Sequence, residues 1–105
     1  MTTPALDPAL QSPTRLVLAS YLSGCDSAEF QAVQQYCDLS PSNLSKHANT
    51  LAELGYVHID KGYVGKRPRT WLSLTSHGRT ALTAHLNALQ HIAAAAAEAA
   101  AHQAK

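Results

Sequence analysis

The sequence has little charge, few aromatic side chains and almost nothing for covalent cross-linking. Charged residues make up 14% of the 105 residues and aromatic residues 6%, with a single Trp and a single Phe. Of the 46% that are hydrophobic, most are small or aliphatic, since 19 are Ala and 14 are Leu. A chain of this length and content forms one domain with one modest core. This excludes a two-domain enzyme with a cleft between lobes.

The net charge of +1 gives the whole chain no general attraction to nucleic acid or to an anionic membrane. The charges are unevenly spread, however. Residues 40–79 contain six of the eight Lys and Arg against two acids, whereas the remainder contains two bases against five acids. One segment is therefore +4 and the rest is −3.

The two cysteines, Cys25 and Cys37, are too few for a disulfide scaffold, and the first residues do not show the basic, apolar and small-residue order of a leader. The nearly uncharged tract 81–97 is mostly Ala interrupted by His, Asn and Gln, which disfavours insertion into a bilayer. These features predict a cytoplasmic protein without a membrane partner.

Two short helices are expected in the first half of the chain. Ser12 can cap a helix that has Pro13 in its first turn and ends at Gly24. Asp26 and Glu29 have capping-box spacing, which predicts that a second helix starts at Asp26.

The third helix, over residues 40–54, has the clearest boundaries. Ser40 can cap it, Pro41 suits its first turn and Gly55 ends it. One face is apolar, through Leu44, Ala48, Leu51 and Leu54. The other faces must then carry the polar residues that crowd its first turns, namely Ser42, Asn43, Ser45, Lys46 and Asn49.

After Gly55 the apolar period changes from 3.6 to 2, with Val57 and Ile59 followed by Leu72 and Leu74. This predicts two antiparallel strands joined by residues 62–69, which hold two Gly, one Pro and three bases. Thr75 then caps a last helix that can run nearly to the end of the sequence. The expected fold is mainly α with a small β-hairpin (α+β), a winged helix-turn-helix with a long C-terminal dimerisation helix.

This arrangement points to double-stranded DNA. An α-helix fits the major groove, and the free N–H groups and dipole of a helix N-terminus favour phosphate. Asn43 and Lys46 carry donors for base edges, and Ser42 and Ser45 are short enough to let the backbone approach. A basic hairpin can straddle phosphates or place Arg67 or Arg69 in the minor groove.

The residues also resemble a known family. The stretches LSPSNLSKHANTLAELGYV (39–57) and GKRPRTWLSLTSHGR (65–79) are similar to small winged-helix regulators related to the MarR and ArsR groups, over about residues 6–92. The resemblance implies a homodimeric bacterial or archaeal transcription regulator. It places Ser42, Asn43, Ser45, Lys46 and His47 on the recognition helix and Lys66, Arg67 and Arg69 on the wing. Ala48 departs from the family pattern, where Leu is common, and leaves room behind the helix.

The last helix has an apolar row typical of a seam between helices, formed by Leu82, Leu86, Leu89 and either Ile92 or Ala93. Because the first three helices and the hairpin can form a core without it, we expect this row to join two subunits, with Leu6 and Leu10 lying against the partner's helix. The predicted organisation is an arm (1–12), a DNA-binding domain (13–75) and a dimerisation helix with an Ala-rich tail (76–105).

Other functions receive less support from the residues. His85, His91 and His102 are not spaced to stack on one helical face, and Cys25 and Cys37 fall on different helices, so we expect no metal and no cofactor. A metal- or ligand-sensing ArsR-like regulator, with a site shared across a dimer, remains an alternative, as does a protein-interaction module without specific DNA binding. A small-molecule effector could bind an apolar crevice beside the last helix, lined by Trp71 or Tyr21. The sequence contains no nucleophile elbow, phosphate loop or paired-carboxylate motif, so an enzyme is not expected.

Overall fold

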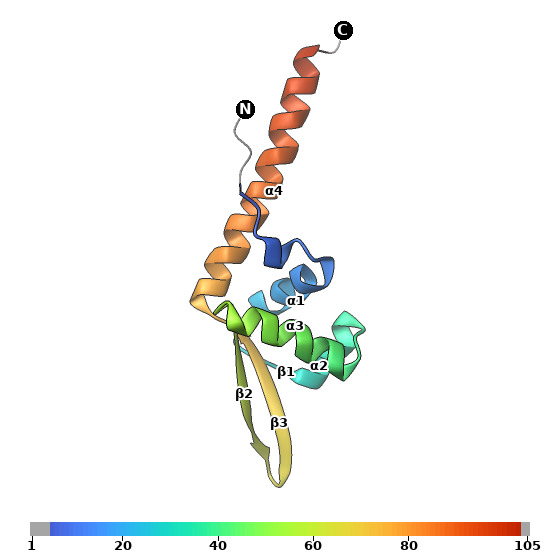
Figure 1. Ribbon diagram of the computed structural model, residues 1–105, viewed down its shortest axis with the longest axis vertical. Coiled ribbons are helices and arrows are strands. Elements are labelled where there is room, and N and C mark those ends of the chain that lie inside the picture. The colour runs from blue at the N-terminus through green and yellow to red at the C-terminus, as the bar shows by residue number, and fades with distance from the viewer. Residues whose placement is uncertain (1–4, 104–105) are drawn as a thin grey trace.

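The structure is a computed structural model that describes residues 5–103. Its elements along the chain are η1 (Pro8–Leu10), α1 (Pro13–Ser23), β1 (Ala28–Glu29), α2 (Phe30–Cys37), α3 (Pro41–Glu53), β2 (Val57–Val64), β3 (Arg67–Leu74) and α4 (Ser76–Gln103). Residues 1–4 of the predicted arm and 104–105 of the predicted tail lie outside this range. The mainly α fold with a small sheet and a long last helix is confirmed (Figure 1).

The predicted caps position α1 and α3 as expected. The Ser12 hydroxyl accepts the Arg15 N–H at 3.4 Å, and the Ser40 hydroxyl accepts the Asn43 N–H at 3.2 Å. Gly55 has φ +78° after the end of α3, a left-handed conformation that glycine adopts without strain. Asp38 is also left-handed, with φ 54°, and it turns the chain from α2 into α3.

The predicted start of the second helix at Asp26 is wrong. Residues 28–29 form β1 instead, which pairs antiparallel with β3 through Ala28↔Leu72 and Glu29↔Trp71, and α2 begins at Phe30. Glu29 precedes α2 without capping it by its side chain. Pairing with the free edge of β3 satisfies this backbone better than an extra helical turn does.

The predicted connection 62–69 is also too long. The strands β2 and β3 pair from Val57↔Leu74 to Val64↔Arg67, so only Gly65 and Lys66 form the turn. Gly65 has φ +63°, as the first central residue of a type II′ hairpin requires. The hairpin, residues 57–74, is called the wing below. It projects from the helices in the direction opposite to α4 (Figure 1).

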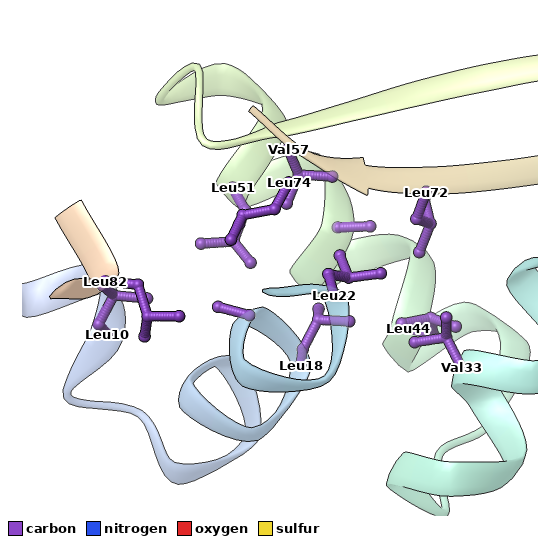
Figure 2. Close-up of a cluster of buried hydrophobic side chains, with 12 residues drawn as sticks. Leu10, Leu18, Leu22, Val33, Leu44, Leu51, Val57, Leu72, Leu74 and Leu82 are labelled. Atoms are coloured by element: carbon purple, nitrogen blue, oxygen red, sulfur yellow. The ribbon is translucent and has the colours of Figure 1, made fainter. Parts of the chain in front are cut away.

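One aliphatic core joins all three predicted segments of the chain. It contains residues of α1, α2, α3 and the sheet together with Leu10 of η1 and Leu82 of α4 (Figure 2). Leu10 is 1% exposed and Leu82 is 5% exposed within the single chain. The expectation that the core forms without the last helix is therefore wrong, and Leu10 and Leu82 pack in their own subunit instead of against a partner.

The N-terminal segment is held by hydrogen bonds to residues distant in sequence. The Asp7 N–H donates to Nδ1 of His85 at 3.1 Å, and the Asp7 carboxylate accepts the Tyr56 hydroxyl and the Ala9 N–H. The hydrogen bond to Asp7, with burial and the charge of Asp7, raises the pKa of Tyr56. His85 is 3% exposed and accepts a backbone N–H, so its imidazole fixes this segment against α4.

A tight joint connects α4 to the wing and to the end of α3. The Thr75 hydroxyl donates to the Gly55 carbonyl at 2.6 Å and accepts the Gly78 N–H at 2.9 Å, which confirms Thr75 as the cap of α4. A Cβ at Gly78 would collide with the Tyr56 carbonyl and approach the Leu74 side chain at 2.9 Å. Gly78 is thus required by close packing at this joint.

Beyond the joint, α4 leaves the body of the protein as a single helix and reaches Gln103 (Figure 1). With the wing projecting in the opposite direction, the molecule measures 68 × 24 × 21 Å. Within residues 5–103, no helix combines the length and apolar character needed to span a membrane.

Candidate nucleic-acid interface

The outer face of α3 is polar, exposed and nearly free of acids. The apolar stripe of Leu44, Ala48 and Leu51 is buried, which turns the remaining faces to solvent. All five residues predicted from this pattern are exposed, namely Ser42, Asn43, Ser45, Lys46 and Asn49. They lie on the first two and a half turns, beside a helix N-terminus whose N–H groups favour an anion.

His47 lies differently from the other predicted residues of α3. It is half-buried, and its Nδ1 lies 3.4 Å from Nη1 of Arg15 on α1. Burial, then the charges of Arg15 and Lys46, lower the pKa of His47 below its usual 6.5. Arg15 in turn donates through Nε to the Ala9 carbonyl at 2.7 Å. His47 thus faces the N-terminal segment and holds α3 against α1, away from the polar outer face.

An open groove of about 390 Å³ separates α3 from the wing. Its floor is apolar and its rim is polar, and its lining consists of Phe30, Pro41, Ser42, Ser45, Ala48, Asn49, Ile59, Lys61, Thr70 and Leu72. Ala48 lies in this lining, where a larger side chain would fill part of the space. The groove places the polar face of α3 and one face of the wing around a common hollow.

Lys61 also lines this groove, a position that the sequence pattern did not predict for the site. It lies two residues after Ile59 on β2 and opposite Thr70 on β3. Alternate residues of a strand share a face. Extending the pattern of Val57 and Ile59 by one step would have placed Lys61 beneath α3.

The predicted bases of the wing fall into two groups. Lys66 and Arg67 are exposed at the turn. Arg69 is half-exposed, and its Nε lies 3.2 Å from Oε1 of Glu29, an ion pair whose angle falls short of hydrogen-bond geometry. With Lys61, these are four bases and no acid over residues 61–70. Glu29 compensates Arg69, and the wing itself holds one acid, Asp60, so Lys66 and Arg67 at the turn are the bases farthest from any acid of the sheet.

Arg79 completes the six bases of the positive segment but has a structural role. Its guanidinium donates to the Ser23 carbonyl at 2.9 Å and to the Cys25 carbonyl at 3.1 Å, at the end of α1. A cation is favoured there by the helix dipole. One of the six bases in residues 40–79 therefore stabilises the fold through these hydrogen bonds.

The residues predicted for the subunit seam are divided between two faces of α4. Leu82 faces the core and Ile92 is half-buried, whereas Leu86 and Leu89 are 41% and 38% exposed. Leu6 is half-buried on the N-terminal segment. Of the residues predicted for the seam, Leu86 and Leu89 are thus the ones that expose a large apolar side chain.

The residues considered for metal or effector binding lie apart from one another. Among residues 5–103, no group of three or more His, Cys, Asp and Glu side chains is placed to hold a metal ion. Cys25 and Cys37 are free thiols, and burial raises the pKa of Cys37. Tyr21 stacks on Tyr36 with ring centroids 4.6 Å apart, and Trp71 lies with His58 and Asp60 on the sheet face away from α3.

Comparison with known proteins agrees with this geometry. A family described as winged helix DNA-binding domain matches residues 14–93. A protein of Methanocaldococcus jannaschii is 30% identical over 70 residues, which are 67% of this chain and 76% of that protein. A transcriptional regulator homologue of Pyrococcus horikoshii has a similar structure, with a TM-score of 0.77 and 30% identity over 83% of this chain and 86% of that one.

More distant structures share the fold. A MarR family transcriptional regulator from Silicibacter pomeroyi has a TM-score of 0.64 and 22% identity, covering 82% of this chain and 60% of that one. NadR, solved in complex with 4-hydroxyphenylacetate, has a TM-score of 0.67 and 19% identity, covering 88% of this chain and 67% of that one. The family match over residues 14–93 and the exposed polar helix beside a basic wing lead to the same conclusion: the chain belongs to the family of winged helix DNA-binding domains, a family of non-enzymatic transcription regulators.

Proposed function

We propose that the protein acts as a homodimer that represses transcription by binding a pseudo-palindromic operator. Each subunit would place α3 in a major groove and set its wing against the neighbouring backbone and minor groove. The observation that carries this proposal is the groove in which the exposed polar side chains of α3 face Lys61 and Thr70 of the wing. A regulator of this kind acts where the chromosome is, in the cytoplasm of a bacterium or archaeon.

The shape of the groove supports binding to one strand of a duplex. The backbone between the major and minor grooves is flanked on both sides by protein when a helix enters one groove and a hairpin reaches the next. Lys61 and the hydroxyls of Ser42, Ser45 and Thr70 supply donors for phosphate along that path. Asn43 and Lys46, on the exposed early turns of α3, can then reach base edges.

The exposed side of α4 supports a second subunit. Residues 86, 89, 93, 96 and 100 recur at alternating intervals of 3 and 4, are all Leu or Ala, and are all exposed. This spacing forms the apolar seam of two-stranded coiled coils. Two copies joined along it form a dyad, which predicts two half-sites about one helical turn apart, roughly 10 bp from centre to centre.

We further propose that binding represses transcription and that a small molecule controls it. A dimer that occupies its operator can exclude other proteins from that DNA without a further surface. A small-molecule effector is proposed by analogy with the complex of NadR with 4-hydroxyphenylacetate, a protein that shares the fold.

Selection of bound duplexes from a random DNA pool tests the function. Enrichment of an inverted repeat is expected, and enrichment of no sequence would favour a winged-helix module that binds another protein. On the best duplex, Asn43→Ala or Lys46→Ala should cost about 1–3 kcal/mol of binding free energy, and much less on random DNA. Asn87→Ala, the same change at an exposed site on α4, should leave both affinities unchanged. Equal losses for Asn43→Ala on both DNAs would contradict base readout.

A further inference from the structure

The end of the wing carries two apolar side chains far from the core. Tyr63 is 73% exposed, the most of any large hydrophobic residue among residues 5–103, and the neighbouring Val64 is 53% exposed. Nothing in the fold requires an apolar residue at either position. Two adjacent exposed residues of this kind at the end of a projection make the tip a candidate for contact with another molecule.

The two residues put one exposed apolar side chain on each face of the wing tip, residues 63–68. Tyr63 pairs with Pro68 on one face, and Val64 pairs with Arg67 on the other. Successive residues of a strand point to opposite faces. Whatever the tip enters would therefore meet an apolar side chain on each side.

The wing is braced just below this tip. The Trp71 ring lies so close over Gly62 that a Cβ there would be 3.2 Å from it, and Arg69, the strand partner of Gly62, is paired with Glu29 of β1. An aromatic ring that covers a glycine across two strands restores the packing that the glycine lacks. The tip is held out by a stiff ribbon, so binding through it requires little ordering of the chain.

Charge identifies the kind of molecule that the tip meets. Lys66 and Arg67 flank the apolar pair, Lys61 precedes it, and residues 61–70 contain no acid. These side chains are suited to a polyanion that also offers apolar surface. The minor groove of duplex DNA is about 6 Å wide, with phosphates on its rims and deoxyribose on its walls.

We propose that Tyr63 and Val64 act as an apolar wedge in the minor groove of the DNA that α3 reads, an inference that rests on the proposed function. The strands of the tip are about 4.8 Å apart, so their side chains cannot enter a groove about 6 Å wide without opening it. The wedge presses against the deoxyribose walls and opens a base step, while Lys66 and Arg67 bind the phosphates on the two rims. The protein then prefers a pyrimidine–purine step at that position, because such steps unstack most readily.

The test uses the full chain and its selected duplex, with 2-aminopurine placed in turn at each adenine outside the half-site centres. Wild-type protein should raise the 2-aminopurine fluorescence at one step per half-site. The double variant Tyr63→Thr with Val64→Thr removes the apolar surface but keeps β-propensity, so the hairpin is preserved. It should bind at least 10-fold more weakly, without the fluorescence rise and with an unchanged salt dependence. Lys66→Ala should keep the rise and reduce the slope of log affinity against log salt by about 0.9.

Each other outcome has a definite meaning. If wild-type protein binds its selected duplex without unstacking, or the double threonine variant binds as well as wild type, the wedge is wrong and the proposed function stands. If wild-type protein selects no duplex, both proposals fail. Binding of the wild type, but not of the double variant, to phosphatidylserine vesicles in the absence of any duplex selection would instead assign the tip to an anionic membrane. Val17→Ser, a change at an exposed valine on α1, serves as the control for lost apolar surface.

Discussion

The two projections of this molecule, the wing and the outer part of α4, both present exposed side chains but differ in chemistry. The wing carries four bases and no acid over residues 61–70, with one aromatic and one branched side chain at its tip. The outer part of α4, residues 84–103, carries one acid and no Lys or Arg, and its exposed row consists of Leu and Ala. The wing is suited to a polyanion, whereas α4 is suited to an uncharged helix like itself. Exposure alone therefore says little about the partner, and the charge beside the apolar residues distinguishes the two.

The largest effect is expected from placing charge on the uncharged projection. Leu86→Glu together with Leu89→Glu buries unpaired carboxylates in the proposed seam, which should separate the subunits. Sedimentation should then show monomers, and affinity for the selected DNA should fall about 100-fold or more because the two recognition helices no longer act together. Ala84→Glu with Asn87→Glu adds the same charge at exposed positions of α4 away from this row and should change neither. A wild-type chain that sediments as a monomer with and without DNA would show that the seam has no partner.

The joint from which both projections start should be the most sensitive backbone position. Gly78→Ala drives a methyl group into the Tyr56 carbonyl, and such overpacking typically lowers the free energy of unfolding by about 1–3 kcal/mol. Gly24→Ala is the matched control, because its Cβ would meet the Tyr21 carbonyl at an ordinary 3.6 Å. Urea denaturation measures both changes. Equal stability of the two variants would mean that the joint yields, and that α4 and the wing are not rigidly connected.

A smaller effect separates two arginines within the wing. Arg67→Ala should reduce the slope of log affinity against log salt by about 0.9, the value for one phosphate contact. Arg69→Ala should reduce it much less, since Glu29 already compensates that charge. Titrations of the selected duplex at several salt concentrations measure the slopes. If the two reductions are equal, the pair between Arg69 and Glu29 opens when DNA binds.

The smallest effect concerns pH and His47, which lies on α3 away from its exposed polar face. Because burial, Arg15 and Lys46 lower the pKa of His47, the unfolded chain takes up a proton at a pH where the folded chain does not. The free energy of unfolding should therefore fall as the pH drops below about 6.5, and it should stay constant above it. His47→Gln should flatten this part of the pH profile, whereas His91→Gln, a change on the exposed side of α4, should not. An unaltered slope in the His47 variant would assign the pH dependence to other groups.

Local signals made α3 predictable in detail. Ser40, Pro41 and Gly55 act through neighbouring residues only, and they fixed both ends of the helix. The buried stripe then determined which side chains are exposed, and the structure agrees for all five of them. His47 was predicted to contact DNA by resemblance alone. Its burial against Arg15 depends on how α1 crosses α3, which local patterns do not show.

Features set by distant partners were not predictable from local patterns. The strand β1 has two residues and exists through pairing with Leu72 and Trp71, more than 40 positions later. Its capping-box spacing is equally compatible with a helix. Gly62 and Pro68 are turn residues by type, yet they lie within paired strands, Gly62 beneath Trp71 and Pro68 at the free end of β3. Both are tolerated in the part of the hairpin that β1 does not reach, because Pro is accommodated where no neighbouring strand needs its missing N–H.

The periodicity of α4 predicted an apolar row but not its partner. Leu82 and Leu89 follow the same spacing, and whether a leucine meets its own core or another chain depends on how far the body of the protein reaches along the helix. The same ambiguity applies to Leu10. It packs in the core of its own chain because the hydrogen bond from Asp7 to His85 holds the N-terminal segment against α4.

In the proposed dimer, the joint at Thr75 and Gly78 would let α4 set the distance between the two half-sites. This joint fixes α4 to the end of α3 and to the start of the wing. A rotation of α4 should therefore move α3 and the wing together with it. Leu89 lies 13 residues beyond Ser76, or about 20 Å along the axis. In a dimer that crosses near Leu89, a change of about 10° in the crossing angle shifts the start of α4 by about 3 Å, close to the rise of one base pair. The distance between half-sites would then be set by the seam of small residues on α4, and substitutions there would retune operator spacing while α3 kept its sequence preference.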